Sequence, residues 1–151
     1  MTNERCEIRP VREEDLNEWF RLRCLLWDET TDAEHHEEMV DIIEDTSSQF
    51  VAVADIGGGR LAGFIEASIR PFVDDCDSEN VGYLEGWYVE QSHRRTGIGT
   101  GMVKIAEEWA RRRGCVEMAS DAEIGNSPSI AAHDRLGYAE TSRLVHFRKE
   151  L

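Results

Sequence analysis

The chain has 151 residues, with 31 acidic and 17 basic side chains and a formal net charge of −14. This length suits one domain with its own hydrophobic core, and no repeat or linker interrupts it, so we expect residues 1–151 to form a single domain. The charged N-terminus excludes a secretory signal, no apolar run reaches membrane-spanning length, and the negative charge disfavours nucleic acid, so we expect a cytoplasmic protein without membrane contact.

The cysteines indicate neither a metal site nor a disulfide framework. Cys6, Cys24, Cys76 and Cys115 are scattered, without C-x-x-C pairs or histidines at ligand spacing. We therefore expect free thiols and no bound metal.

The negative charge is concentrated in residues 28–85. This segment contains sixteen acidic residues against only Arg60 and Arg70, so it carries the whole net charge, while the rest of the chain is balanced. Such a field favours a cationic acceptor over an anionic one. For the acidic run between Glu34 and Glu44, a solvated helix face is the simpler interpretation.

The first half of the chain predicts strands and helices in alternation. Apolar residues recur near the helical period over residues 16–27, and Gly57-Gly58-Gly59 joins two apolar runs as a hairpin signal. We expect strands over residues 7–11, 50–54 and 61–69, and helices over residues 15–27 and 31–43.

The second half begins with a polar, acidic stretch over residues 70–80, where Pro71 argues against continued strand pairing. We expect this stretch to be a loop that closes as a lid over the acceptor. Strands are then expected over residues 81–89, 115–120 and 138–149, and helices over residues 97–113 and 127–136.

The junction between strand 81–89 and helix 97–113 is the most informative motif. From Leu84 to Gly101 it runs LEGWYVEQSHRRTGIGTG. Gly97 and Gly99 leave the first helical amides uncovered by Cβ atoms, and those amides lack acceptors within the helix and lie at its positive end. The pattern indicates a phosphate site, although glycines at such a turn also serve tight packing alone.

The spacing Arg94-x-x-Gly97-x-Gly99 resembles the R/Q-x-x-G-x-G/A signature of the GNAT superfamily of N-acetyltransferases. Residues 126–138 resemble a second element of that superfamily, except that His133 stands where most members have tyrosine. The resemblance implies an α/β (α+β) GNAT fold, with a single central, mixed, mostly antiparallel sheet flanked by helices. Its fourth and fifth strands would splay around acetyl-coenzyme A.

The same resemblance implies the cofactor-binding residues. Asn126 would hydrogen-bond the pantetheine arm, and the Val89 amide, freed by a bulge in the central strand, would meet the developing oxyanion. The implied cofactor-binding set is Trp87, Val89, Arg94, Arg95, Thr96, Gly97, Ile98, Gly99, Thr100 and Asn126.

Further blocks are similar to the bacterial aminoglycoside 6'-N-acetyltransferases over nearly the whole chain. They include residues 25–27, 67–70, 76–78, 84–86, 114–121 and 147–149. The string EMASD over residues 117–121 is the most specific of them, because neither cofactor chemistry nor strand propensity requires it. An aminoglycoside carries several ammonium groups, which agrees with the acidic segment.

This family resemblance places the acceptor at Trp27, Phe72, Glu85 and Asp121. Trp27 and Phe72 have the simpler alternative of packing in the core or beneath a loop. Glu85 lies in an apolar strand, so its carboxylate should be partnered or face a water-filled cleft, and we favour the cleft. Asp121 follows the fifth strand, where it could instead cap a turn. Ser142 stands where relatives can have an acid, which puts one acceptor contact in doubt.

Three residues are the catalytic candidates. Glu85, through water, and Asp121 are alternative bases for the acceptor ammonium, and the amine would attack the thioester directly. His133 would protonate the departing thiolate in place of tyrosine, or would be an ordinary packed histidine.

The sequence leaves three functions open. The chain is an aminoglycoside 6'-N-acetyltransferase, an N-acetyltransferase for another polycation such as a polyamine or basic peptide, or a non-catalytic acetyl-coenzyme A sensor. Glu85 and Asp121 disfavour the sensor, which needs no base. The closing strands and the resemblance predict a homodimer.

Overall fold

The structure is a computed structural model that describes residues 5–151. Its helices are α1 (Leu16–Leu26), α2 (Asp32–Glu44), α3 (Ile98–Arg112) and α4 (Ser127–Arg135), with 3-10 turns η1 (Glu13–Asp15) and η2 (Gln91–His93). Its strands are β1 (Glu7–Pro10), β2 (Gln49–Gly57), β3 (Arg60–Arg70), β4 (Val81–Val89) and β5 (Met118–Ser120).

The strands form a five-stranded sheet in the order β1-β2-β3-β4-β5. The first four pair antiparallel, whereas β5 lies parallel to β4. At the predicted hairpin Gly57, Gly58 and Gly59 have φ of 87°, 63° and 74°, a region that residues with a Cβ seldom adopt. The mixed, mostly antiparallel sheet confirms the predicted fold class.

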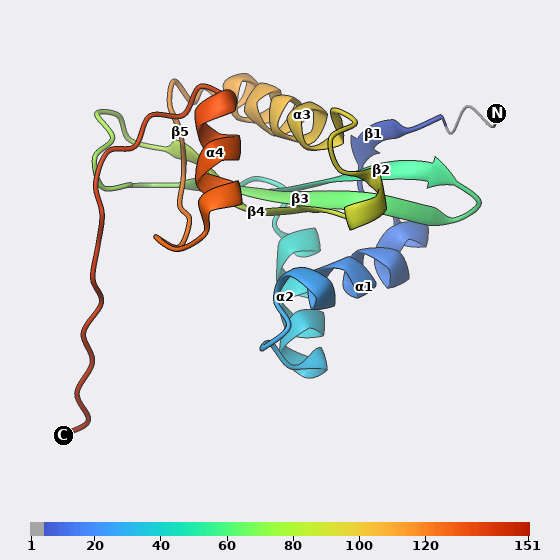
Figure 1. Ribbon diagram of the computed structural model, residues 1–151, viewed down its shortest axis with the longest axis horizontal. Coiled ribbons are helices and arrows are strands. Elements are labelled where there is room, and N and C mark those ends of the chain that lie inside the picture. Colours follow the sequence, from blue (N-terminus) through green and yellow to red (C-terminus); the bar gives the residue numbers. More distant parts are fainter. Residues whose placement is uncertain (1–4) are drawn as a thin grey trace.

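Helices cover both faces of the sheet, with α3 on one side and α1 and α2 on the other (Figure 1). On the α3 side Met102 and Val103 are fully buried against the sheet, and on the other side Trp19, Leu22 and Phe64 are fully buried. Each such side chain stabilises the fold by about 1.5–3 kcal/mol relative to exposure. The sheet is therefore fixed from both sides.

β4 and β5 separate soon after they meet. They pair at Gly82 with Met118, at Tyr83 with Ala119 and at Leu84 with Ser120, and β4 then continues to Val89 without β5 beside it. We call this opening between β4 and the chain after Ser120 the fork. It confirms the predicted splay of the fourth and fifth strands.

A β-bulge lies just beyond the base of the fork. Glu66 of β3 pairs with Gly86, but Ala67 pairs with Leu84, so Glu85 is the extra residue of β4. The bulge places the Glu85 carboxylate beside Ser68 on β3. The expected bulge is therefore present, but it re-aims Glu85 and lies four residues before Val89.

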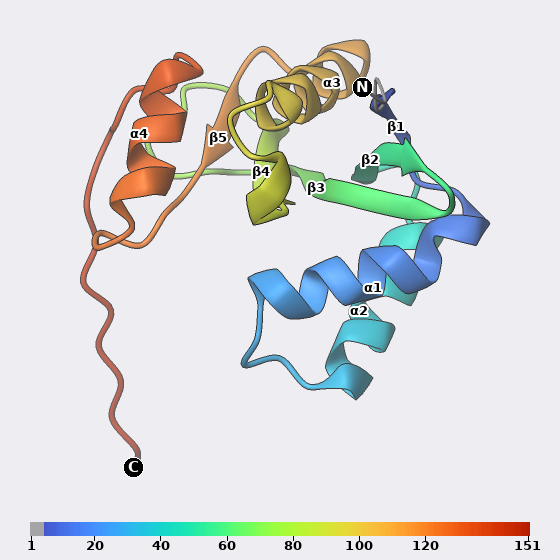
Figure 2. The same ribbon diagram turned by 45° about the vertical axis from the view of Figure 1, so that its right-hand side comes forward.

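The closing strands predicted over residues 138–149 are wrong for this chain taken alone. Residues 138–151 form no strand, and residues 139–151 extend away from the sheet as an arm (Figures 1 and 2). Its apolar side chains Leu144, Val145 and Phe147 are 69%, 77% and 92% exposed. A strand needs a partner backbone, and the arm does not turn back to the β5 edge to find one.

Within residues 5–151, no helix is both long and apolar enough to cross a membrane.

Candidate active site

The N-terminus of α3 presents unpaired backbone donors. Its N-cap Gly97 has a left-handed φ of 87° and no side-chain cap. The first helical bond runs from the Gly101 N–H to the Gly97 carbonyl at 3.0 Å, so the preceding amides, those of Ile98, Gly99 and Thr100, have no acceptor in the helix. No acidic residue occupies the first turn. This end of α3 is therefore electropositive and suited to an anion.

The loop before α3 is braced so that these amides stay open. The Arg94 side chain donates from Nε to the Val89 carbonyl at 2.8 Å, and the Thr96 hydroxyl donates to the His93 carbonyl at 2.6 Å. Arg95 itself has φ of 64°, in the left-handed region. Arg94 and Thr96 therefore shape the loop, while the Ile98 side chain packs into the core and only its amide faces the anion site.

Gly99 lies over the end of β4. A Cβ there would meet only the Val89 side chain at 3.8 Å and the Trp87 indole nitrogen at 3.9 Å, both ordinary contacts. The glycine is not required by internal packing. The space beside it is therefore available for a ligand, and the residues of the loop fit the pyrophosphate of coenzyme A.

The Val89 amide faces the fork because of the pairing pattern of β3 and β4. Glu90 N–H donates to the Ala62 carbonyl at 2.8 Å, so the neighbouring pair, Gly63 and Val89, is a non-hydrogen-bonded pair. The Val89 N–H consequently points away from β3, toward the side that β5 has left. The Glu85 bulge sets this direction, because the Gly82 N–H before it faces β5 whereas the Glu90 N–H after it faces β3, and divergence of β5 then leaves the Val89 amide without a strand partner.

His133 lies across the fork on α4, which runs beside β5 (Figure 2). Its Nδ1 is 2.7 Å from the Ser129 carbonyl, which assigns a proton to Nδ1, and its Nε2 is 2.8 Å from the Ser120 hydroxyl. Its ring centroid is 4.8 Å from that of Trp87 on β4. His133 is thus oriented by backbone and Ser120, with Nε2 directed at the fork.

Asn126 has a structural role in this region. Its side-chain oxygen accepts the Ser129 N–H at 3.2 Å and caps α4. The predicted contact with the pantetheine arm would therefore use the amide nitrogen of the same side chain.

Glu85 is both exposed and partnered. Its Oε1 accepts from the Ser68 hydroxyl at 2.5 Å and from Arg70 Nε at 3.0 Å, and its Oε2 accepts from Arg70 Nη2 at 2.7 Å. The side chain is 32% exposed. Of the two alternatives left by the sequence, a partner or a water-filled cleft, the structure supplies the partner, a bidentate arginine, although the cleft was favoured.

Asp121 is tied to β4 by a tyrosine. The Tyr83 hydroxyl donates a short hydrogen bond to Asp121, and the Arg70 guanidinium carbon lies 3.5 Å from the centroid of the Tyr83 ring. Burial, followed by the hydrogen bond to Asp121, raises the pKa of Tyr83, so the phenol stays protonated and donates. Tyr83 and Arg70 thus join Glu85 and Asp121 into one cluster, which we call the carboxylate cluster.

Trp27 ends α1 at the edge of the core. A Cβ on Gly86 would lie 2.5 Å from the Trp27 ring, so the indole packs directly on the β4 backbone. The Arg23 guanidinium lies 4.8 Å from the centroid of that ring, and His35 Nε2 is 3.2 Å from the Trp27 carbonyl. Trp27 is therefore held on both sides at the edge of the core, against the residue that follows Glu85, and its acceptor role stays a prediction.

The support beneath Trp27 is a buried polar network. Arg23 pairs with Glu66 at 3.1 Å and donates from Nε to His35 Nδ1 at 3.3 Å, and it also pairs with the more exposed Glu38. Glu66 is 4% exposed, and its Oε2 lacks a hydrogen-bond partner among the described residues. Burial raises the pKa of Glu66 to about 8, against the opposing effect of Arg23.

The acidic loop over residues 71–80 is anchored. Glu117 Oε1 accepts from the Asp77 N–H at 2.9 Å and from the Ser78 N–H at 2.6 Å. The Asn80 N–H closes the loop onto the Pro71 carbonyl at 3.0 Å. Phe72 is 71% exposed on this loop, so it is not packed beneath the loop, and its acceptor role stays a prediction.

Sequence reasoning missed four residues of the site, Arg70, Tyr83, Glu117 and Ser120. The last two belong to the EMASD string, whose members now have separate contacts. Glu117 anchors the loop, Ser120 orients His133 and Asp121 accepts from Tyr83. The specificity of that string was the signal that could have found them.

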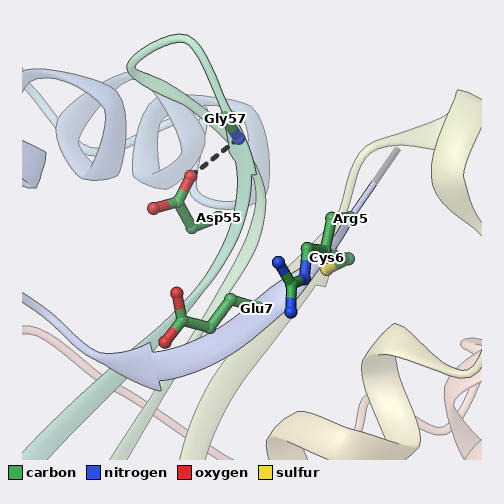
Figure 3. Close-up of a pocket in the computed structure, with 5 residues that line it drawn as sticks. All are labelled: Arg5, Cys6, Glu7, Asp55 and Gly57. Carbon is green, nitrogen blue, oxygen red and sulfur yellow. Dashed lines mark hydrogen bonds between the residues drawn. The ribbon is translucent and has the colours of Figure 1, made fainter. Parts of the chain in front are cut away.

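Other chemistry has little support in residues 5–151. Burial raises the pKa of all four cysteine thiols, which disfavours a thiolate nucleophile. No group of three metal-ligating side chains is arranged for a metal in the described part of the chain. The pocket in Figure 3 is lined by Arg5, Cys6, Glu7, Asp55 and Gly57 at the β1–β2 edge, away from the fork.

Comparison with known proteins agrees with this geometry. The acetyltransferase (GNAT) family matches residues 16–138, and the chain belongs to that family. Aminoglycoside N(6')-acetyltransferase type 1 of Klebsiella aerogenes is 44% identical over 95% of this chain and 96% of its own length. The enzyme of the same name from Acinetobacter baumannii is 40% identical over 95% of this chain and 98% of its own.

Solved structures give the same result. AAC(6')-Iy in complex with the bisubstrate analog CoA-S-monomethyl-acetylneamine has a TM-score of 0.90 and 33% identity, covering 97% of this chain and 99% of that one. The apo aminoglycoside antibiotic 6'-N-acetyltransferase AAC(6')-IG from Acinetobacter haemolyticus has a TM-score of 0.88 and 36% identity, covering 96% and 99%.

Glu66→Gln is expected to change how stability depends on pH. The folded pKa of about 8 exceeds the value near 4.3 of an unfolded chain, so between them the folded protein holds a proton that the unfolded chain has released. Wild-type stability should therefore fall as pH rises through this interval, and the glutamine variant should lose that component. Urea denaturation from about pH 5 to about pH 8 measures the difference.

Glu44→Gln on the exposed face of α2 is the matched control. A constant difference between Glu66→Gln and wild type across this pH range contradicts a protonated buried carboxyl.

Proposed function

We propose that this protein transfers the acetyl group of acetyl-coenzyme A to the 6'-amino group of aminoglycoside antibiotics, in a ternary complex, and so confers resistance. The observation that carries the proposal is the placement of an anion-binding helix start and a carboxylate cluster along the same strand, β4. The named activity of relatives at 44% and 40% identity supports the choice of acceptor.

Acetyl-coenzyme A supplies an activated acetyl thioester when bound. The residues that would hold it are the amides at the start of α3 for the pyrophosphate, and Trp87 and Val89 along the fork. The Val89 N–H faces the fork and would donate to the thioester oxygen as negative charge develops there.

The carboxylate cluster would receive the acceptor ammonium. Glu85, through a water, or Asp121 would take one proton, and the neutral amine then forms the new C–N bond as the C–S bond breaks. The departing sulfur is a thiolate that gains from a proton. His133, protonated, would give it one from Nε2, because Nδ1 is already engaged with Ser129.

We further propose that the protein is a homodimer whose arm, residues 139–151, completes the sheet of a second copy. The exposed Leu144, Val145 and Phe147 and the position of β5 at the sheet edge support this. Its four thiols, free within the described residues, and its use of acetyl-coenzyme A suit the cytoplasm.

Removing residues 139–151 is expected to convert a dimer into a monomer, because the truncated chain lacks the apolar arm that would pack on the sheet of the second copy. Sedimentation velocity measures the mass of each form. A full-length protein that sediments as a monomer at all concentrations contradicts the proposal.

The enzymatic test follows thiol release with acetyl-coenzyme A and a panel of acceptors. Kanamycin and other aminoglycosides with a 6'-amine should turn over, while 6'-hydroxyl analogues should not, and the KM for kanamycin should rise with salt. Preference for spermidine over every aminoglycoside overturns the proposed acceptor.

The same assay assigns the base. Glu85→Gln keeps the shape but not the proton acceptor, so kcat should fall by about 10² and the acidic limb of the pH–rate profile should vanish if Glu85 is the base. If Asp121 is the base, Asp121→Asn shows that pattern and Glu85→Gln mainly raises KM. Near-normal turnover in both variants would show that neither carboxylate takes the proton from the acceptor ammonium.

A further inference from the structure

Arg70 is a cation inside a site that should attract cations. It is one of two arginines in the acidic segment over residues 28–85, and the other, Arg60, pairs with Glu18 and Glu90 at the β2–β3 hairpin. Arg70 instead binds both carboxylate oxygens of Glu85, at 3.0 Å and 2.7 Å. Its charge thus lies where the proposed acceptor needs a free carboxylate.

The surroundings of the Arg70 guanidinium form a complete cation site. Glu85 holds it from one side, and the face of Tyr83 lies under it at 3.5 Å. Tyr83 in turn donates to Asp121, so the guanidinium contacts Glu85 directly and is linked through Tyr83 to the second carboxylate predicted to bind the acceptor. The hydrogen bonds and charge of Glu85 raise the pKa of Arg70, and it stays a cation.

Arg70 is also able to leave. It is the last residue of β3, directly before Pro71, and its side chain is 42% exposed. Water and salt screen a pair at this exposure, so it holds Arg70 less firmly than a buried pair of the same bidentate geometry would. An incoming ammonium group can therefore replace the guanidinium on Glu85 while the arginine turns toward solvent.

We propose that Arg70 is a specificity-determining residue, which occupies the ammonium subsite between Glu85 and Asp121 until a polycationic acceptor displaces it. This inference rests on the proposed function. Amines with several positive charges recover the cost of displacement through the rest of the acidic segment. A monoamine has no such additional contacts, so Arg70 sets a minimum binding free energy that only acceptors with several charges reach.

The test compares Arg70→Gln with Arg60→Gln, which removes the same charge from the same segment but outside the site. Acceptors are kanamycin and 6-amino-6-deoxyglucose, a monoamine, and each is followed by thiol release and by calorimetric binding. Arg70→Gln should lower the KM for kanamycin by about two- to fivefold, in line with loss of one partly exposed ion pair. It should raise kcat/KM for the monoamine by a similar factor, and Arg60→Gln should change neither the KM for kanamycin nor kcat/KM for the monoamine.

Two outcomes overturn the inference. If Arg70 merely holds Glu85 in place, Arg70→Gln raises the KM for both acceptors and lowers kcat. If the two variants behave alike, only long-range charge is involved. Wild-type turnover of kanamycin is measured first, because its absence refutes the proposed function itself, whereas either outcome above refutes only the role of Arg70.

Discussion

The loss of β5 as a partner of β4 after Leu84 is the constraint on which the rest of the site depends. A strand that continues without a neighbour exposes backbone amides, and buried or half-buried amides require an acceptor. Here Val89 lies at a non-hydrogen-bonded position toward β3, so its N–H faces the fork. α3 begins at the same end of β4 with its own unpaired donors. The protein thus gathers donors for a ligand rich in carbonyl and phosphate oxygens.

The proposed acceptor site, the carboxylate cluster, depends on an earlier part of the same strand, β4. The Glu85 bulge adds one residue to β4 and directs a carboxylate to the face shared with Ser68 and Arg70. Trp27 packs on Gly86, the residue after Glu85, and is supported by the buried Arg23–Glu66 pair, in which loss of either side chain would leave buried hydrogen-bonding groups of the other unsatisfied. Specific geometry at an open surface is therefore maintained by a polar network in the core.

Local chemistry made much of the fold predictable. Gly57-Gly58-Gly59 and Gly97 require backbone conformations that other residues avoid, and they mark the hairpin and the start of α3 in the sequence. The strand over residues 138–149 was mispredicted because its partner is not local: a β pattern indicates extended backbone but not where the pairing edge lies. The bulge was placed by analogy, and its position depends on the register of β3, which no single segment encodes.

The site divides in the same way. Gly97 and Gly99 mark a helix start whose open amides follow from the helix itself, so this part could be predicted, whereas Val89 was named from the family resemblance. Arg70, Tyr83, Ser120 and Glu117 contact their partners through side chains between 13 and 39 positions apart, across β3, β4, α4, the loop of residues 71–80 and the chain around β5. Hydrophobic periodicity does not indicate which distant side chains come into contact. These contacts depend on how the strands and helices are placed in three dimensions.

The central claim is that the open amides of the fork are the cofactor site, and hydrogen exchange at the Val89 amide tests it most directly. That amide should exchange rapidly in the free protein and become protected on addition of acetyl-coenzyme A, and in Gly99→Val, where the added side chain fills the space over β4, the protection should be lost. An amide already protected in the free protein, or protected equally by acetyl-coenzyme A in Gly99→Val, would contradict the account.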